Sequence, residues 1–164
     1  MFLLQIKMYC DGGCRGNGKA FNCGGYGVVL IHGDYIKKMC GYKADTTNNK
    51  MELLSVIAGL RALKKHNIDL HIYVDSNYVY SGITIWSKKW KQGNWNYAKK
   101  NGILNLNYWM EIDRLLDLIS NSGGCYTLHK VKGHSGDRYN ELADKLANHA
   151  MNHSLNCDDV RDVM

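Results

Sequence analysis

The order of hydrophobic periods along the chain is the feature that most constrains its fold. Residues 3–10, 25–32 and 35–42 alternate as β-strands do, and Gly33-Asp34 between the last two is typical of a tight hairpin turn. From residue 48 onward, helical and strand-like segments alternate. The chain contains no proline, so Gly, Asn and Asp residues have to form its turns.

The segments after residue 48 add four helices and two strands. The predicted helices cover residues 48–66, 77–91, 107–120 and 137–153, and the further strands cover residues 69–75 and 124–131. Three antiparallel strands followed by this alternation predict an α/β domain: a five-stranded mixed sheet, three antiparallel strands then two parallel, with helices on both faces. We expect the domain to span residues 1–153 and residues 154–164 to form a flexible tail.

Composition narrows the class of protein. The 164 residues are 45% hydrophobic and 22% charged, and no apolar run approaches the ~20 residues of a membrane span. Residues 1–9 lack the basic lead and the small-residue cleavage site of a secretory signal. We therefore expect neither a membrane protein nor a secreted one. A cytoplasmic location is the default, and a monomer without an obligate protein partner is the prior expectation.

Charge and cysteine content add two further expectations. Lys and Arg outnumber Asp and Glu by 21 to 15, a net charge of +6, and residues 86–101 hold five lysines and no acid. This distribution favours an anionic partner. The six cysteines include no second close pair beside Cys10 and Cys14, which argues against a zinc site and for reduced, structural thiols of the kind usual in the cytosol.

Four acidic residues stand where burial is expected. Asp11 and Asp75 end the first and fourth predicted strands, and Glu52 and Asp144 lie in the first and last predicted helices. If those strands are neighbours, Asp11 and Asp75 project from adjacent strand ends, where like charges repel unless a cation lies between them. All-oxygen ligands suit Mg²⁺ or Mn²⁺, and two such ions about 3.5–4 Å apart support phosphodiester hydrolysis. Taken singly, each residue is also compatible with a turn or with a solvated helix position.

Six blocks of the sequence resemble type 1 ribonuclease H, in the order of that family. They include Tyr-Cys-Asp-Gly-Gly at residues 9–13, at the end of the first predicted strand, and Lys-Gly-His-Ser-Gly at residues 132–136, before the last predicted helix. The blocks are residues 9–17 with 24–27, 46–53, 75–79, 82–84, 132–136 and 140–147. The similarity extends over about residues 5–150, and six blocks in register are far more specific than any one of them.

This resemblance implies the ribonuclease H fold and hydrolysis of the RNA strand of an RNA–DNA hybrid, leaving 5′-phosphate and 3′-hydroxyl ends. It implies that Asp11, Glu52, Asp75 and Asp144 hold two Mg²⁺ ions, for which Mn²⁺ can substitute. Asp11 would bridge both ions, and Glu52 would also face the 2′-hydroxyl of the cleaved nucleotide. His134 matches the loop histidine of the family, which we expect to shuttle protons or to help product leave without being indispensable.

Recognition of a hybrid requires groups that read the 2′-hydroxyl, which only RNA carries. The resemblance assigns this role to asparagines and implies a pocket for a phosphate of the DNA strand. The asparagines are Asn17, Asn48, Asn49 and Asn77, and the pocket residues are Thr47 and Asn105. Turn and cap chemistry is the other explanation for these asparagines. Asp45 stands where the family often has Arg, so we expect either that Lys43 substitutes or that the pocket binds less tightly.

An aromatic and basic stretch resembles the protrusion with which the family holds the DNA strand. It comprises Trp86, Lys88, Lys89, Trp90, Lys91 and Trp95. Lysines release counterions from phosphates, and aromatic faces carry sugars or bases, so affinity should fall with salt. The i, i+4 spacing of Trp86 and Trp90 is also compatible with a core stripe, and we expect at least one of these two rings to be mostly buried.

Two alternatives from other classes stay open at this level. The chain could be a non-catalytic hybrid-binding module, or the nuclease domain of a reverse transcriptase, a retroelement protein or an integrase-like relative. The full carboxylate set argues against the first alternative, and the asparagine and lysine sets argue against the second. No separate hybrid-binding domain is expected before the first strand, which predicts low processivity and strong salt sensitivity.

Overall fold

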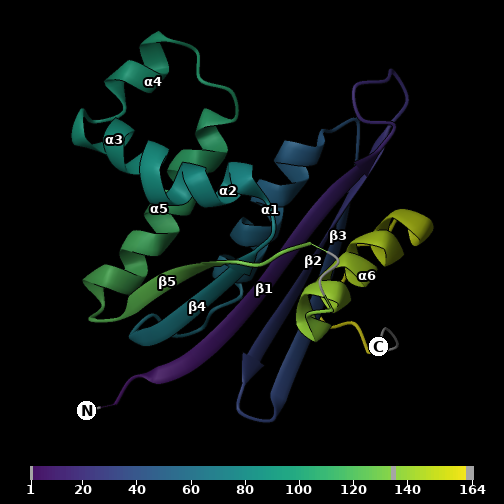
Figure 1. Cartoon of the computed structure of the whole chain (residues 1–164), viewed down its shortest axis with the longest axis horizontal. Coiled ribbons are helices and arrows are strands. Elements are labelled where there is room, and N and C mark those ends of the chain that lie inside the picture. Colours follow the sequence, from purple (N-terminus) through teal and green to yellow (C-terminus); the bar gives the residue numbers. More distant parts are fainter. Residues whose placement is uncertain (1, 134–135, 162–164) are drawn as a thin grey trace.

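Five strands form one mixed sheet in the computed structural model, which describes residues 2–133 and 136–161 (Figure 1). The strands are β1 (Leu4–Arg15), β2 (Cys23–His32), β3 (Tyr35–Ala44), β4 (Ile68–Val74) and β5 (Cys125–Lys130). Their order across the sheet is β3-β2-β1-β4-β5, with β1–β2 and β2–β3 antiparallel and β1–β4 and β4–β5 parallel. The predicted α/β fold with three antiparallel and two parallel strands is confirmed.

Helices connect and cover the sheet. They are α1 (Asn48–Arg61), α2 (Asn77–Ser81), α3 (Ser87–Gln92), α4 (Asn96–Lys100), α5 (Leu106–Asn121) and α6 (Arg138–His153), and a π-helical turn, Gly82–Trp86, joins α2 to α3. Thr47 caps α1 by accepting a hydrogen bond from the Lys50 amide, and Asp137 caps α6 in the same way. Within the described residues, no helix is both long and apolar enough to cross a bilayer.

The first helix is shorter than its sequence pattern predicts. It ends at Arg61 instead of residue 66, and just beyond it the Leu63 amide donates to the carbonyl of Leu60, three residues back, so the last turn tightens. Leu63, just beyond, is still buried in the core. The apolar period therefore continues through a turn that leads the chain into β4.

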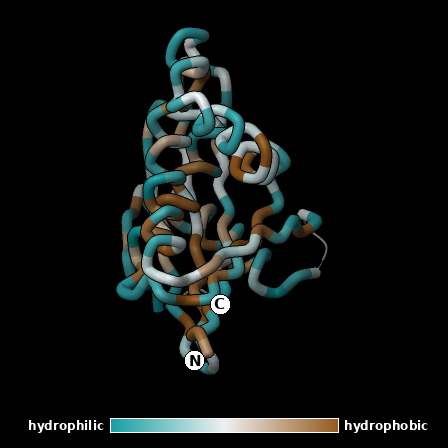
Figure 2. The backbone as a smooth tube through the Cα atoms, turned by 90° about the vertical axis from the view of Figure 1, so that its left-hand side faces the viewer, coloured by the Kyte–Doolittle hydropathy of each residue, from teal (hydrophilic) through white to brown (hydrophobic). Residues whose placement is uncertain are grey.

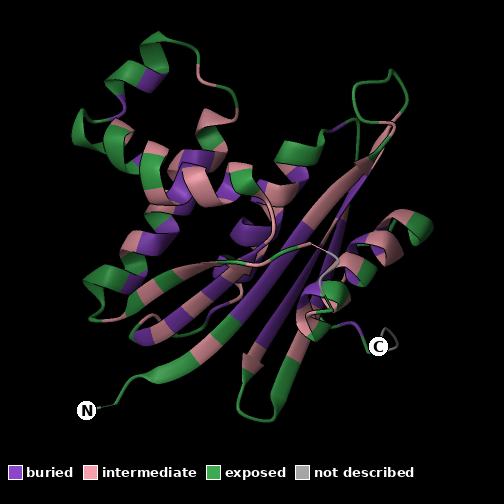
Figure 3. Cartoon of the chain, in the orientation of Figure 1, coloured by how far each residue is buried: buried purple, intermediate pink, exposed green. Residues whose placement is uncertain are grey.

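The sheet is covered on both faces, as predicted. α1 and α5 pack on one face, over a core that includes Met8, Leu53 and Trp109, and α6 packs on the other (Figure 1). Figure 2 shows hydrophobic segments through the middle of the molecule, and Figure 3 shows the corresponding buried stretch of the central strands. The two hydrophobic clusters lie on opposite faces of the sheet, and β1 and β2 contribute buried side chains to both.

Glycines let both helices approach the sheet closely. A Cβ on Gly24 would lie 2.4 Å from the Met51 side chain of α1, whereas a Cβ on Gly25 or Gly27 would lie 2.2 Å or 2.1 Å from carbonyl oxygens of α6. Successive residues of a strand point to opposite faces. Gly24 therefore allows α1 to approach one face of the sheet, and Gly25 allows α6 to approach the other.

The described part of the C-terminal tail returns along the outer strand of the sheet. The expected flexible tail begins at residue 154, and within it Cys157 exchanges two backbone hydrogen bonds of 2.9 Å with Cys40 of β3. The Val160 amide donates to the Lys38 carbonyl at 2.8 Å, and the Val160 side chain is 6% exposed. The chain therefore doubles back after α6 and runs antiparallel to β3.

Gly27→Ala is expected to destabilise the fold by about 1–3 kcal/mol, because the added methyl group meets the Ala143 backbone, which cannot rotate away. For a chain of this length, that corresponds to a fall of roughly 3–10 °C in the thermal midpoint, measured by circular dichroism. Gly93→Ala is the matched control, since the nearest atom to its Cβ is 4.0 Å away. Equal midpoints for Gly27→Ala and the parent chain would contradict the close packing of α6 on β2.

Candidate active site

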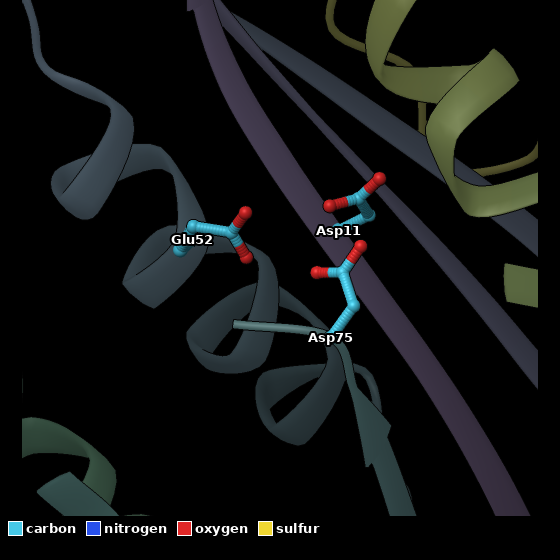
Figure 4. A group of neighbouring side chains, drawn as sticks. All are labelled: Asp11, Glu52 and Asp75. Carbon is cyan, nitrogen blue, oxygen red and sulfur yellow. The ribbon is translucent and has the colours of Figure 1, made fainter. Parts of the chain in front are cut away.

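Three carboxylates from distant parts of the sequence meet beside β1. Asp11 lies within β1, Asp75 follows the last residue of β4, and Glu52 lies near the start of α1. One oxygen atom of each lies within 4.8 Å of the other two, and Figure 4 shows the three side chains pointing toward one another. Among the described residues, this group alone brings at least three His, Cys, Asp or Glu side chains to such distances.

The lengths of β1 and β4 bring two of these carboxylates together. Pairing between the strands ends at Cys10 and Val74, whereas β1 continues to Arg15 because it stays paired with β2. Asp11 was predicted to end its strand, and this is wrong: it lies in mid-strand, at the first position beyond β4. Asp75 therefore occupies the space next to Asp11 that β4 has vacated.

A glycine brings the third carboxylate to the same place. β1 passes under α1 at Gly12, where a Cβ would lie 2.4 Å from the Met51 carbonyl carbon. Only a residue without a side chain permits this approach, which carries Glu52 to Asp11. The Gly12 amide also donates a hydrogen bond of 3.0 Å to Asp11 Oδ1.

Burial raises the pKa of all three carboxyl groups, and nearby negative charges add to the effect. Burial, then the charges of Asp75 and Asp144, raise the pKa of Asp11 to about 8, and Asp11 is 7% exposed. Burial and the neighbouring Asp11 raise the pKa of Glu52 well above its usual range. Burial also raises the pKa of Asp75, against the opposing charge of Lys130. Without a bound cation, the cluster therefore favours protonated carboxyl groups near neutral pH.

Asp144 approaches the cluster from the other face of the sheet. It lies on α6, is partly exposed, and its charge raises the pKa of both Asp11 and Asp75. It is not one of the three residues whose ligand atoms lie within 4.8 Å of one another. The structure thus places the fourth predicted carboxylate near the cluster but outside its closest group.

The loop before α6 reaches the cluster at Gly133. A Cβ on Gly133 would lie 3.3 Å from Asp75 Oδ2. The predicted auxiliary residue His134 lies outside the described residues.

Sequence reasoning missed Lys130, at the end of β5. Its ammonium group donates to the backbone carbonyl of Asp75, and its charge lowers the pKa of the Asp75 carboxyl group. Its Cα pairs with Val74, so β5 and β4 end at the same edge of the sheet. The parallel pairing of these two strands, which brings their ends to one edge, is the signal that locates Lys130 beside Asp75.

Five of the predicted substrate-binding residues line one pocket of about 540 Å³. They are Asn17, Thr47, Asn48, Asn49 and Asn105, and Gly18, Lys50 and Leu104 complete the lining. Lys50 was not predicted, and Asp45 does not line the pocket. Lys50, from the first turn of α1, is the cation among the lining residues, which include neither Asp45 nor Lys43.

Hydrogen bonds fix the orientation of two pocket amides. Asn17 Oδ1 accepts from the Asn48 backbone amide at 3.1 Å, and Asn48 Oδ1 accepts from the Cys14 backbone amide at 2.6 Å. Because backbone amides can only donate, the side-chain oxygens must face inward, which leaves both side-chain NH₂ groups as donors for a ligand. Asn105, at φ +60°, donates through its own NH₂ group to the Tyr78 hydroxyl at 3.0 Å. The pocket asparagines therefore make local hydrogen bonds of the kind found in caps and turns and also line the pocket.

Asn77 lies apart from this pocket, as the exposed first residue of α2, two residues after Asp75. Its neighbour Ser76 caps α2 by accepting from the Val79 amide at 3.2 Å. Asn77 is therefore separated from the pocket residues and directly follows the segment that carries Asp75.

The predicted protrusion divides into exposed and internally bound residues. Lys88 and Lys89 are exposed on α3, whereas the Lys91 ammonium binds Asp113 at 3.1 Å and Asp117 at 2.6 Å on α5. Trp86 and Trp90 are partly buried against Trp109. Trp95 is 7% exposed and packs on Trp90, so its ring offers no open face to a strand. Lys91 and Trp95 stabilise the protrusion more than they extend its surface.

Comparison with known proteins agrees with this geometry. The family model described as RNase H matches residues 4–152. The chain is 46% identical over 147 residues to a ribonuclease H from Ruthia magnifica subsp. Calyptogena magnifica, covering 90% of this chain and 95% of that protein. It is 44% identical over 144 residues to a ribonuclease H from Marinobacter nauticus, covering 88% and 92%.

Solved structures give the same result. LC9-RNase H1, described as a type 1 RNase H with the type 2 active-site motif, superposes with a TM-score of 0.83 at 29% identity, covering 99% of this chain and 79% of that one. LC11-RNase H1 shares the fold, with a TM-score of 0.62 at 19% identity and coverage of 91% and 98%. The family match over most of the chain, joined to the carboxylate cluster, shows that this chain belongs to the ribonuclease H family of hydrolytic endonucleases.

Proposed function

We propose that the chain hydrolyses the RNA strand of RNA–DNA hybrids by two-metal-ion catalysis, leaving 5′-phosphate and 3′-hydroxyl ends. The observation that carries the proposal is the convergence of Asp11, Glu52 and Asp75 within 4.8 Å in a partly buried site. Asp144, whose charge acts on Asp11 and Asp75, is the fourth residue of the proposed site.

The donor set fits Mg²⁺, with Mn²⁺ as a substitute. All of the donors are carboxylate oxygens, which hard divalent cations prefer, and among residues 2–133 and 136–161 neither His nor Cys belongs to the close group. Burial, and then the charges of neighbouring carboxylates, raise the pKa of Asp11 and Glu52, and a bound cation would favour their ionised forms. When bound, two such ions supply activation of the attacking water and stabilisation of the leaving oxygen.

The protein residues hold this chemistry in place. We propose that Asp11, whose pKa is affected by Glu52, Asp75 and Asp144, would help to hold both ions, and that Glu52 would also face the 2′-hydroxyl of the cleaved nucleotide. Lys130 fixes the backbone at Asp75 and offsets part of its negative charge. We assign His134 an auxiliary role in proton transfer or product release.

Hybrid recognition is proposed for the asparagine pocket and for α3. The oriented NH₂ groups of Asn17 and Asn48 suit 2′-hydroxyl or phosphate oxygens, and Lys50 suits a phosphate. LC11-RNase H1, which shares this fold, was solved in complex with an RNA/DNA hybrid. The six free cysteines suit a reducing compartment, and we propose a cytoplasmic monomer.

The substrate and metal are tested with one labelled strand in four duplexes: RNA–DNA, RNA–RNA, DNA–DNA and DNA with a single ribonucleotide. Each duplex is incubated with Mg²⁺, Mn²⁺ or EDTA. We expect metal-dependent cleavage of RNA in the hybrid alone, and a loss of at least about 10³-fold in Asp11→Asn. Binding of the hybrid without cleavage would favour a non-catalytic module, and cleavage of DNA–DNA would favour an integrase-like activity.

The protrusion is tested by its lysines. Replacing Lys88 and Lys89 with Ala should raise KM and reduce the salt slope of hybrid binding by up to about 2, since each phosphate contact contributes about 0.9. Lys91→Ala should mainly lower the thermal midpoint, because it removes the ion pairs between α3 and α5. Replacing the exposed Lys64 and Lys65, in the turn after α1, is the control. An unchanged slope in the Lys88/Lys89 variant would remove α3 from the binding surface.

The metal-free protein should lose stability as pH rises. The pKa of Asp11 is raised from 3.8 to about 8, so between these values the folded state binds more protons than the unfolded state. The stabilising contribution of protonated Asp11 is therefore complete below pH about 4 and lost above pH about 8.

Asp11→Asn, which cannot ionise, should consequently melt higher than the parent chain in EDTA at pH 8, and the gap should shrink at pH 5. Mg²⁺ should narrow the gap at pH 8 by stabilising the parent. Asp34→Asn, in the exposed β2–β3 turn, is the control for a lost surface charge. A pH-independent gap would mean that Asp11 is not repelled by its neighbours.

A further inference from the structure

Two cysteines face each other where the C-terminal tail meets β3. Cys40 and Cys157 form an antiparallel bridge, in which each backbone amide donates to the other residue's carbonyl at 2.9 Å. The Cα atoms of such a hydrogen-bonded pair lie about 5.5 Å apart. A disulfide requires about 4.4–6.8 Å between Cα atoms, so the backbone spacing allows one.

The two side chains also point the same way. Residues directly opposite each other in an antiparallel pair share one face. Both Cys40 and Cys157 belong to the cluster beneath α6 that contains Val29, Ala150 and Val160. Burial raises the pKa of the Cys40 thiol, and the nearby Cys157 thiol raises it further. Spacing and direction therefore both favour a covalent link.

The tail is held in this register on both sides of Cys157. Asn156 Oδ1 accepts from the Tyr42 backbone amide at 2.9 Å, and the Val160 amide donates to the Lys38 carbonyl at 2.8 Å. These contacts pre-align the cysteines before any bond forms. By contrast, Cys14 and Cys23 belong to different register pairs, with Gly24 and Arg15 respectively, so they do not face each other directly.

We propose that Cys40 and Cys157 form a thiol–disulfide modification site, which a small disulfide such as glutathione disulfide oxidises to clamp the C-terminal tail onto β3. The six cysteines are free in this structure, so the reduced form is the one described. The proposal does not depend on the nuclease activity.

The two thiols have different roles in the exchange. Cys157 is partly exposed and Cys40 is 2% exposed, so the Cys157 thiolate attacks a sulfur of glutathione disulfide first. The first glutathione leaves as its thiolate, and Cys157 carries the second in a mixed disulfide. The Cys40 thiolate then attacks the Cys157 sulfur and releases that second glutathione. Two protein thiols are oxidised, one glutathione disulfide is reduced, and the two thiol protons end on the two glutathiones.

The clamp should stabilise the fold. It would close the chain from residue 40 to residue 157, which includes most of the domain, and cross-links that close long loops restrict the unfolded chain most. α6 lies between these residues in sequence and packs on the same cluster. Oxidation would therefore tie the end of the chain to the sheet edge and hold α6 against β2 and β3.

The experiment compares the folded full-length chain after incubation with glutathione disulfide or with reduced glutathione. Free thiols are alkylated, and intact mass and non-reducing peptide mapping locate the bond. We expect a Cys40–Cys157 cross-link, with a mass loss of two hydrogen atoms, and a thermal midpoint higher by roughly 5–10 °C that dithiothreitol reverses.

Two serine variants make the result specific. Cys157→Ser should lose both the cross-link and the oxidant-dependent shift, while keeping the midpoint of the reduced parent within a few degrees. Cys125→Ser, at an exposed position on β5, should retain both. A glutathione adduct that stays on Cys157, a cross-link between other cysteines, or a cross-link without a change in midpoint would each overturn the proposal.

Discussion

Repulsion among three partly buried carboxylates is the constraint on which the site depends. One oxygen atom each of Asp11, Glu52 and Asp75 lies within 4.8 Å of the others, and burial, helped by nearby carboxylates that include Asp144, raises the pKa of each. Such an arrangement opposes folding at neutral pH unless protons or cations occupy it. The packed cores on both faces of the sheet have to offset that cost. The same repulsion makes the cluster a strong attractor for divalent cations, so the cost in stability and the capacity for catalysis have one origin.

Close approach of two helices to one sheet is how the fold imposes this arrangement. Gly12 admits α1 to β1, and Gly25 and Gly27 admit α6 to β2 from the opposite face. Glu52 and Asp144 thereby reach the same strand edge from opposite sides. The space between them is open because β4 stops at Val74 while β1 continues. A longer β4 would fill that space with backbone, and the carboxylates would no longer meet.

The topology could be predicted from the sequence because the change from strand to helical periods is local. Strand ends could not, since they depend on pairing: Gly12-Gly13 has the composition of a turn, yet β2 keeps β1 extended through it. Neighbouring strands suggested that Asp11 and Asp75 lie close together, whereas the complete carboxylate set came from a family resemblance, because the sequence separation of Glu52 and Asp144 hides their proximity. The contacts of Lys130 and Lys91 were not predicted, for a related reason. Their partners, Asp75 for the first and Asp113 with Asp117 for the second, are distant in sequence and no spacing rule connects them.

The two edge strands of the sheet, β3 and β5, differ in length and charge, which explains why the C-terminal tail pairs with β3. β5 is a short edge of six residues ending in Lys130, and short, charged edges resist further pairing. β3 is longer, with ten residues, and exposes apolar Tyr35 and Ile36 near its start. The tail pairs with β3 at Cys40 and Lys38, which satisfies backbone groups that would otherwise be open to another chain. The tail follows α6 directly. The same short segment therefore covers the edge of the sheet at β3 and helps to hold in place the helix that carries Asp144.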